Sequence, residues 1–286
     1  MKPHNIILTA ETGSDLTAEE ASRLGVFLVP MHVAMGSESR ADGSFTPEEV
    51  CAYYDKTGKV PQTSAASQYD FECVFDEVER LNPGASIVHL AYSAVTTASY
   101  HNALMAAAGS GYDVRCVDTR HVSVGQRAVV LGAVNLLYRH PDLTPEQLCR
   151  AVEDLASCTD MTFVPQDLDY LRAGGRVSNA AALISGALNL HPAIHVSDGR
   201  LVAGHKYRGN MVKVAQRLLR DEAEAHNFRR DRLWFIESPG LPDEVKRAAE
   251  SEAGALGFEN TEWVKTGCVI TCHGGHGAFG VVGISK

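Results

Sequence analysis

Polar side chains that can bind a carboxylate occur in three short clusters. Residues 63–67 read Thr-Ser-Ala-Ala-Ser and come just before an expected helix. Residues 93–99 follow an expected buried strand and begin with Ser93. Residues 271–277 read Thr-Cys-His-Gly-Gly-His-Gly and contain His273. Hydroxyl and imidazole groups donate hydrogen bonds, so each cluster has the chemistry of an anion site.

Each cluster also has a simpler structural interpretation. Ser64 or Ser67 could cap the following helix by accepting from free backbone N–H groups. Some hydroxyls after Ser93 must also be helix caps. A strand end that leads into a helix N-terminus is nevertheless a favourable place for an anion, so Ser93 and nearby backbone amides could bind a carboxylate. Glycines at 274 and 275 permit positive φ and close backbone approach. His273 could donate to a carboxylate near neutral pH, or could be incidental to a tight turn.

A zinc site is a further interpretation of the third cluster. Cys268, Cys272, His273 and His276 have the spacing C-x3-C-H-x2-H, which only loosely resembles a zinc motif. Residues 263–271 are expected to form a strand that continues to His273. Side chains alternate along a strand, so Cys268 and Cys272 would face one side and His273 the other. We therefore expect no metal.

Hydrolytic catalysis and nucleotide binding have weak support in the sequence. Ser93, His273 and an aspartate could form a hydrolytic triad. The sequence contains no G-x-S-x-G motif, which argues against a hydrolase of that type. Gly174 and Gly175 belong to neither a G-x-G-x-x-G motif nor a Walker motif, so we expect no nucleotide cofactor.

Short apolar strands alternate with helices in the first half of the chain. Strands are expected at residues 5–10, 86–91 and 114–118, and at 26–33, where Pro30 marks a sheet edge or a strand end. This alternation predicts a parallel sheet flanked by helices. Ligands of such sheets bind beyond the carboxyl ends of the strands.

The second half predicts a different architecture. Strands come closer together, and Ser197–Arg200 is a strong hairpin signal. The fold class is therefore α/β: an N-terminal parallel sheet with helices over residues 1–159, and a C-terminal α+β domain over residues 160–286. Two domains suit a chain of 286 residues.

Charge and composition exclude several classes of function. The formal net charge of −9 argues against general binding of nucleic acid or of anionic membrane surfaces. No apolar run approaches the roughly 20 residues of a membrane-spanning helix, and the N-terminus is not typical of a signal peptide. Seven scattered cysteines do not suggest a disulfide framework, so we expect a cytoplasmic protein.

The ordered set of motifs resembles the DegV family along almost the whole chain. Residues 170–178, Tyr-Leu-Arg-Ala-Gly-Gly-Arg-Val-Ser, are the most specific segment and are very similar to the family's Tyr-Leu-x-x-Gly-Gly-Arg-Ile-Ser. Similar matches in the same order occur at residues 11–16, 63–67, 188–192, 206–208 and 273–277.

The resemblance implies a protein that binds a fatty acid between its two domains and needs no cofactor. It implies that Thr63, Ser93 and His273 hold the carboxylate, and that an apolar tunnel holds the tail. Adjacent residues of the same motifs complete the expected ligand site: Ser64, Ala94, Gly274 and Gly275.

The resemblance also implies a partner, a kinase subunit of the dihydroxyacetone-kinase type that phosphorylates the presented carboxylate with its own ATP. The protein would then be a carrier and not itself an enzyme. Arg172 and Arg176 lie in a short basic cluster and are candidates for docking this partner.

Some motif positions differ from the family pattern. Ala94 lacks a hydroxyl, Ala98 replaces a glycine, His276 replaces a proline, and Glu11 replaces an aspartate. These differences bear on which ligand is bound. Two other functions therefore stay open: an enzyme that acts on an acyl or other small carboxylate substrate through Ser93 and His273, and a sensor that binds lipid without passing it on.

Overall fold

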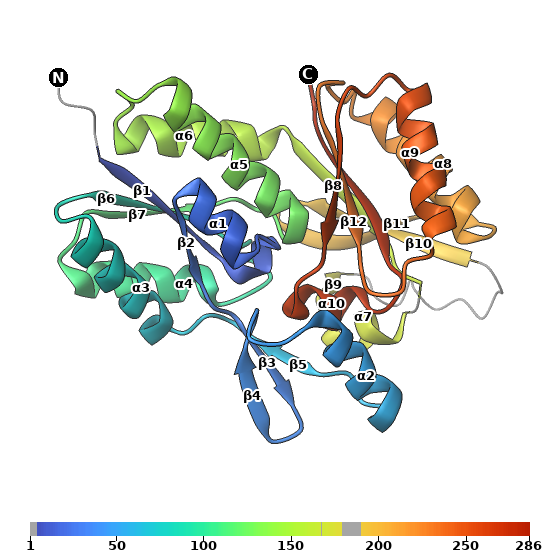
Figure 1. The fold of residues 1–286 in the computed structure, drawn as a ribbon, viewed down its shortest axis with the longest axis horizontal. Coiled ribbons are helices and arrows are strands. Elements are labelled where there is room, and N and C mark those ends of the chain that lie inside the picture. Colours follow the sequence, from blue (N-terminus) through green and yellow to red (C-terminus); the bar gives the residue numbers. More distant parts are fainter. Residues whose placement is uncertain (1–4, 167, 179–189) are drawn as a thin grey trace. The chain divides into compact units, whose positions relative to one another are not determined.

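The computed structural model describes residues 5–166, 168–178 and 190–286 (Figure 1). Part of the motif at residues 188–192 therefore lies outside the described residues. Internal contacts divide the chain into two units. Unit 1 is Met1–Ser44 with Thr63–Ser157, and unit 2 is Phe45–Gln62 with Cys158–Lys286. The expected bounds of 1–159 and 160–286 differ from this division mainly in residues 45–62, which group with the second half of the chain.

The main sheet of unit 1 has four strands in the order β2-β1-β6-β7, and every neighbouring pair is parallel. The strands are β1 Ile6–Glu11, β2 Val26–Val29, β6 Ser86–Ala91 and β7 Val114–Asp118. The predicted parallel sheet is confirmed. The chain leaves β1 toward β2 but leaves β6 toward β7, so the direction of winding reverses between β1 and β6. Sheets of this kind bind ligands at that reversal.

Helices pack against this sheet and bury its central strands. They are α1 Ala18–Leu24, α3 Gln68–Leu81, α4 Ser99–Ser110, α5 Ser123–Arg139 and α6 Pro145–Ser157. Leu8 and Leu90 from the strands share a core with Val129, Val130 and Leu148 from α5 and α6. Apart from Ser86 at its start, every residue of β6 is buried, as expected for a strand covered on both faces.

A small second sheet in the order β4-β3-β5 carries one of the predicted polar clusters. Its strands are β3 His32–Met35, β4 Glu38–Ala41 and β5 Gln62–Ser64. The interpretation of Pro30 as a strand end is confirmed, because β2 stops at Val29 and β3 begins at His32. The β3–β4 hairpin was not expected from the sequence.

Unit 2 is built on a mixed sheet in the order β13-β12-β14-β8-β10-β11-β9. Its strands are β8 Thr159–Val164, β9 Val177–Ser178, β10 Leu190–Ser197, β11 Arg200–Arg208, β12 Leu233–Glu237, β13 Thr261–Lys265 and β14 Phe279–Ile284. The predicted hairpin is confirmed between β10 and β11. Asp198 (φ 47°) and Gly199 (φ 77°) both adopt the left-handed conformation that two-residue hairpin turns favour.

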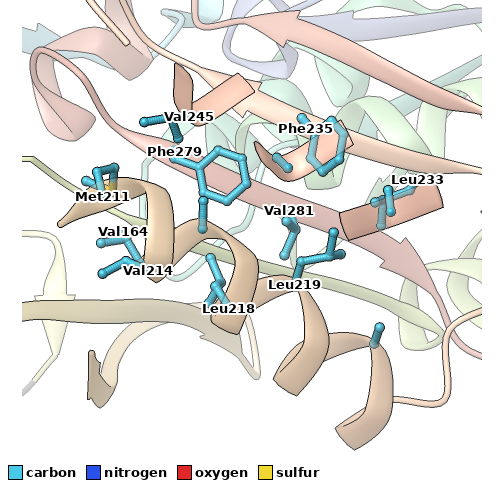
Figure 2. Packing of buried hydrophobic residues seen from close by; sticks show 14 of the residues in the cluster. Val164, Met211, Val214, Leu218, Leu219, Leu233, Phe235, Val245, Phe279 and Val281 are labelled. Atoms are coloured by element: carbon cyan, nitrogen blue, oxygen red, sulfur yellow. The ribbon is translucent and has the colours of Figure 1, made fainter. Parts of the chain in front are cut away.

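The core of unit 2 lies between its sheet and helices α8 Met211–Ala225 and α9 Asp243–Ala255. Figure 2 shows Phe235 and Phe279 of the sheet in the same cluster as Val214 and Leu218 of α8. The buried residues of α8 recur with helical spacing, which fixes the face that it presents to the sheet.

Three short helices of unit 2 pack together: α2 Pro47–Thr57, α7 Asp169–Gly174 and α10 Cys268–Gly274. The contact of α2 with α10 is one reason why residues 45–62 group with unit 2. The predicted strand at residues 263–271 is confirmed only up to Lys265, where β13 ends, and is wrong beyond it, because α10 begins at Cys268. Valine, isoleucine and threonine favour strands locally, but burial of Cys268, Val269, Thr271 and Cys272 follows a helical repeat.

The helix α10 replaces the strand geometry that was expected for Cys268, Cys272 and His273. Cys268 and Cys272 lie one turn apart on a helix and not on one face of a strand. Within the described part of the chain, His, Cys, Asp and Glu side chains form no group of three suited to a metal ion. None of the described helices has the length and apolar character needed to cross a bilayer.

Candidate functional site

The expected ligand residues are distributed over both units. Ser93 and Ala94, together with Thr63 and Ser64, belong to unit 1. The remaining members belong to unit 2: His273, Gly274, Gly275, Arg172 and Arg176.

Ser93 occupies a tight turn at the carboxyl end of β6, where the winding of the sheet reverses. Its side chain is fully buried. Its N–H donates to the carbonyl of His121 over 2.9 Å. The N–H and the hydroxyl of Thr96 both donate to the Ser93 carbonyl, at 3.1 Å and 2.9 Å. The backbone at Ser93 is therefore fixed from two sides.

The amides beside Ser93 already donate within the protein. The Tyr92 N–H donates to Oε2 of Glu11 (2.9 Å), and the Ala94 N–H donates to Oδ1 of Asp118 (3.2 Å). The carboxylate acceptors come from the ends of β1 and β7, on either side of β6. An anion at this strand end would therefore meet side-chain donors rather than the backbone N–H groups of residues 92–94.

The cluster at residues 63–67 divides into two roles. Thr63 and Ser64 lie on β5, with Thr63 half-buried and Ser64 exposed. Ser67 is the N-cap of α3, where it accepts from the Asp70 N–H while its own N–H donates to Asp70 Oδ2. The predicted cap is confirmed for Ser67, which leaves Thr63 and Ser64 as the candidates for ligand binding.

Hydrogen bonds tie this cluster to the segment that follows Ser93. The Ala66 N–H donates to Oγ of Ser99 (3.2 Å), and Nδ2 of Asn102 donates to the Ala66 carbonyl (2.7 Å). Ser99 and Asn102 lie in the first turn of α4. Unit 1 thus brings its two polar clusters to one region.

In unit 2, His273 lies in the last turn of α10 and packs against α7. Burial, reinforced by the positive charge of Arg176, lowers the pKa of His273 to about 4. The imidazole is therefore neutral near pH 7, and a neutral imidazole still donates one hydrogen bond.

Glycines around His273 permit this packing. A side chain at Gly174 would overlap the imidazole of His273, and one at Gly275 would overlap the Tyr170 ring. Gly175 ends α7 with a left-handed φ of 59°. Gly174, in the segment at residues 170–178 that resembles the family motif, therefore lies directly against His273.

Tyr170 and Tyr54 were not predicted to belong to this region. The Tyr170 side chain is 2 % exposed, and its ring centroid lies 4.8 Å from that of Tyr54 on α2. The Tyr54 hydroxyl donates to Oδ2 of Asp169, and Sγ of Cys268 donates to the Phe45 carbonyl. Tyr170 lies within a recognised motif, but no local signal linked Tyr54 to it, because the two residues are 116 positions apart.

Both candidate docking arginines of unit 2 are exposed. Arg172 lies 3.5 Å from Asp169, and Nη1 of Arg176 donates to the Gly174 carbonyl over 3.0 Å. His276 is also exposed and lies against Gly240.

A buried polar network next to the Ser93 turn was not predicted from the sequence. It contains Glu11, His89, Gln126 and Thr9, each with 0 % exposure. Burial alone would raise the pKa of Glu11, but the charge of His89 and hydrogen bonds from His89, the Tyr92 amide and Gln126 hold it below its ordinary value. A glutamate at the end of an otherwise apolar strand was the available sequence signal.

Comparisons with known proteins cover nearly the whole chain. Residues 5–286 match a family model described as "Uncharacterised protein, DegV family". A DegV domain-containing protein of Deinococcus radiodurans is 29 % identical over 278 residues, which are 97 % of each chain. A DegV family protein from Thermus thermophilus, described as fatty-acid-binding, aligns with a TM-score of 0.87 and 27 % identity over 99 % of this chain and 100 % of its own.

A more distant structure confirms the fold. DegV from Bacillus subtilis aligns with a TM-score of 0.83 and 19 % identity over 99 % of this chain and 100 % of its own. The family resemblance seen in the sequence is confirmed, and the chain belongs to the DegV family.

Proposed function

We propose that this protein is a fatty-acid carrier in which Thr63, Ser93 and His273 bind the carboxylate. The full-length similarity to the fatty-acid-binding Thermus thermophilus protein carries this proposal. The placement of Ser93 at the winding reversal of the parallel sheet supports it, because ligands of such sheets bind there.

The chemistry of the three side chains suits a carboxylate. Two hydroxyls and a neutral imidazole supply three donors, and a buried carboxylate is stable only where several donors converge on it. Burial of the tail contributes about 0.8 kcal/mol per CH2. Affinity can therefore come from the acyl chain, while the polar residues select the head group. Ser64, Ala94, Gly274 and Gly275 belong to the same proposed site.

A hydrolase that uses Ser93 and His273 has less support. A general base that works near pH 7 needs a pKa close to 7. The pKa of His273, lowered to about 4 by burial and Arg176, makes this imidazole a weak proton acceptor. The same group remains an adequate hydrogen-bond donor, which suits binding better than catalysis.

Native mass spectrometry followed by organic extraction tests the proposal directly. We expect a fatty acid bound in a 1:1 ratio with the purified protein, or 1:1 uptake of added palmitate after delipidation. A protein that contains no fatty acid and takes up none would reject the carrier function. Hydrolysis of acyl esters at a rate abolished in Ser93→Ala would favour the enzyme instead.

Single substitutions test the site. We expect Ser93→Ala and Thr63→Ala each to weaken palmitate binding by roughly 10-fold, the loss of one hydrogen bond to a charged group. Ser110→Ala is a matched control, because the Ser110 hydroxyl donates to the Ala107 carbonyl at the end of α4. Unchanged affinity in both site variants would reject this assignment while leaving lipid binding itself intact.

We further propose that the protein works in the cytoplasm with a partner, a fatty-acid kinase subunit of the dihydroxyacetone-kinase type. Such a kinase would transfer the γ-phosphoryl group of its ATP to the bound carboxylate, which yields an acyl phosphate and ADP. The exposed Arg172 and Arg176 are the candidate docking residues. Palmitate-loaded protein, kinase and ATP should yield acyl phosphate, and Arg172→Ala should slow its formation without changing palmitate affinity. Binding without transfer would favour a sensor.

A further inference from the structure

Glu11 carries a fully buried carboxylate at the carboxyl end of β1. Its Oε2 accepts from the Tyr92 N–H and from Nε2 of Gln126, both at 2.9 Å. Its Oε1 lies 3.4 Å from Nε2 of His89. Burial of an ionised carboxylate is unfavourable unless donors surround it, and an apolar substitute is often at least as stable. The contacts of Glu11 therefore suggest a role beyond stability.

Among these contacts, the hydrogen bond from the Tyr92 amide bears most directly on Ser93. The Tyr92 amide is one peptide unit away from Ser93, and that unit is planar and stiff. The next two amides are fixed as well, by the His121 carbonyl and by Asp118. The hydrogen bond to Glu11 therefore connects the Ser93 turn, which follows β6, to the end of β1. These are the two strands between which the winding reverses.

A second contact joins the same two segments. A side chain at Gly13, two residues after Glu11, would meet the Tyr92 ring at 3.0 Å. Tyr92 is thus held on its backbone by Glu11 and on its ring by the segment that follows Glu11. Gln126 strengthens the arrangement, because its Nε2 also donates to the Leu90 carbonyl of β6 (2.8 Å).

We propose that Glu11 is a positioning residue for ligand binding, whose buried carboxylate fixes the Tyr92 amide and thereby places the Ser93 hydroxyl. This inference rests on the proposed function, in which Ser93 binds the ligand carboxylate. Glu11 itself makes no contact with ligand in this proposal, so its effect on affinity must pass through Ser93.

A double-mutant cycle separates positioning from a general structural role. Palmitate affinity is measured by calorimetry for the wild type, Glu11→Met, Ser93→Ala and the double variant. Methionine has no carboxylate to accept from the Tyr92 amide, so we expect Glu11→Met to weaken binding about 10-fold when Ser93 is present, as for loss of a hydrogen bond to a charged group. In the Ser93→Ala background we expect less than about a twofold further loss, because coupled residues are not additive.

Thr9→Val is the matched control. Thr9 lies on the same face of β1, is equally buried, and its hydroxyl contacts Nδ1 of His89 over 2.9 Å. We expect this variant to lose stability but to bind palmitate within about twofold of the wild type. Additive losses from Glu11→Met and Ser93→Ala, or a Thr9→Val effect as large as that of Glu11→Met, would overturn the positioning role.

Amide hydrogen exchange of the ligand-free protein keeps this inference distinct from the proposed function. We expect slow exchange at Tyr92 and Ala94 in the wild type, and faster exchange at Tyr92 in Glu11→Met but not in Thr9→Val. Unchanged exchange at Tyr92 in Glu11→Met would overturn the inference even if palmitate binds. If palmitate does not bind the wild type, the proposed function fails and the ligand-positioning role fails with it, while exchange still reports whether Glu11 fixes the turn.

Discussion

Ser93 and His273 are held in place by different physical means. The turn at Ser93 is fixed by directional hydrogen bonds to buried or half-buried acceptors from neighbouring strands. Around His273 the packing is close: the imidazole lies against Gly174, and a neighbouring Tyr170 ring touches Gly275. The first arrangement should be sensitive to loss of charge and acceptors, and the second to added volume.

The largest expected effect is on the closely packed region around His273. Gly174→Ala places a methyl group where the His273 ring lies. Overpacking of this kind costs up to about 3 kcal/mol of stability, or displaces the ring. We expect a lower midpoint of urea unfolding together with weaker palmitate binding.

Gly254→Ala is the control for Gly174→Ala. Gly254 lies inside α9, and a methyl group there would meet nothing within 4 Å. Alanine favours a helix over glycine by roughly 0.5–1 kcal/mol, so this variant should be as stable as the wild type or more stable. If both alanine variants behave alike, close contact with His273 is not what Gly174 provides.

The second effect is on the pH dependence of stability, because His273 and Glu11 titrate in different pH ranges. The pKa of His273 is lowered to about 4, so the unfolded chain binds a proton at this residue before the folded protein does. Stability from this group is complete above about pH 6.5 and declines as the pH falls toward 4, by about 2 kcal/mol between pH 7 and pH 5. Urea unfolding at both pH values should show this loss in the wild type and a smaller one in His273→Asn.

The lowered pKa of Glu11 also makes stability fall as the pH decreases, but this loss occurs at a lower pH than the one from His273. Its stabilising charge is fully present above about pH 4.5 and is lost only as the pH falls through its lowered value. The Ser93 region should therefore keep its amide protection at pH 5, where the region around His273 has already weakened. Equal pH dependence of wild type and His273→Asn would contradict this contrast.

The sequence predicted the parts of both regions that depend on local patterns. The parallel sheet followed from short apolar strands alternating with helices, and Ser67 was identified as a possible cap from its position just before an expected helix. The sequence also singled out Ser93, because a hydroxyl just after a buried strand has a distinctive place in such a sheet.

Long-range contacts account for what the sequence did not predict. The Tyr92–Glu11 hydrogen bond joins residues 81 positions apart, and Gln126 reaches Glu11 over 115 positions. No local pattern links such pairs. The helix α10 was mistaken for a strand because its β-branched residues favour strands locally, whereas burial of one helical face decides the structure.

A smaller effect is expected at the far edge of the Ser93 turn. Asp118 accepts from the Ala94 and Arg120 amides at 3.2 Å and 2.9 Å, and Arg120 has a left-handed φ of 54°. Asp118→Ala removes both bonds and should cost about 1.5 kcal/mol. Asp118→Asn keeps an acceptor oxygen and should restore most of this stability in thermal unfolding. If asparagine fails to rescue, the charge and not the acceptor geometry of Asp118 holds the turn.

The smallest effect separates capping from ligand binding within one short cluster. Ser67 caps α3, so Ser67→Ala should cost about 1 kcal/mol of stability and leave palmitate affinity unchanged. Thr63 lies on β5 outside the helix, so Thr63→Ala should change thermal unfolding little. Because Thr63 is a proposed carboxylate donor, the same variant should weaken palmitate binding. A loss of affinity in Ser67→Ala as large as in Thr63→Ala would mean that the whole segment, and not the Thr63 hydroxyl, determines binding. The opposite pattern, with affinity changed only by Thr63→Ala, would show that two hydroxyls four residues apart have separate tasks, one in the fold and one in the site.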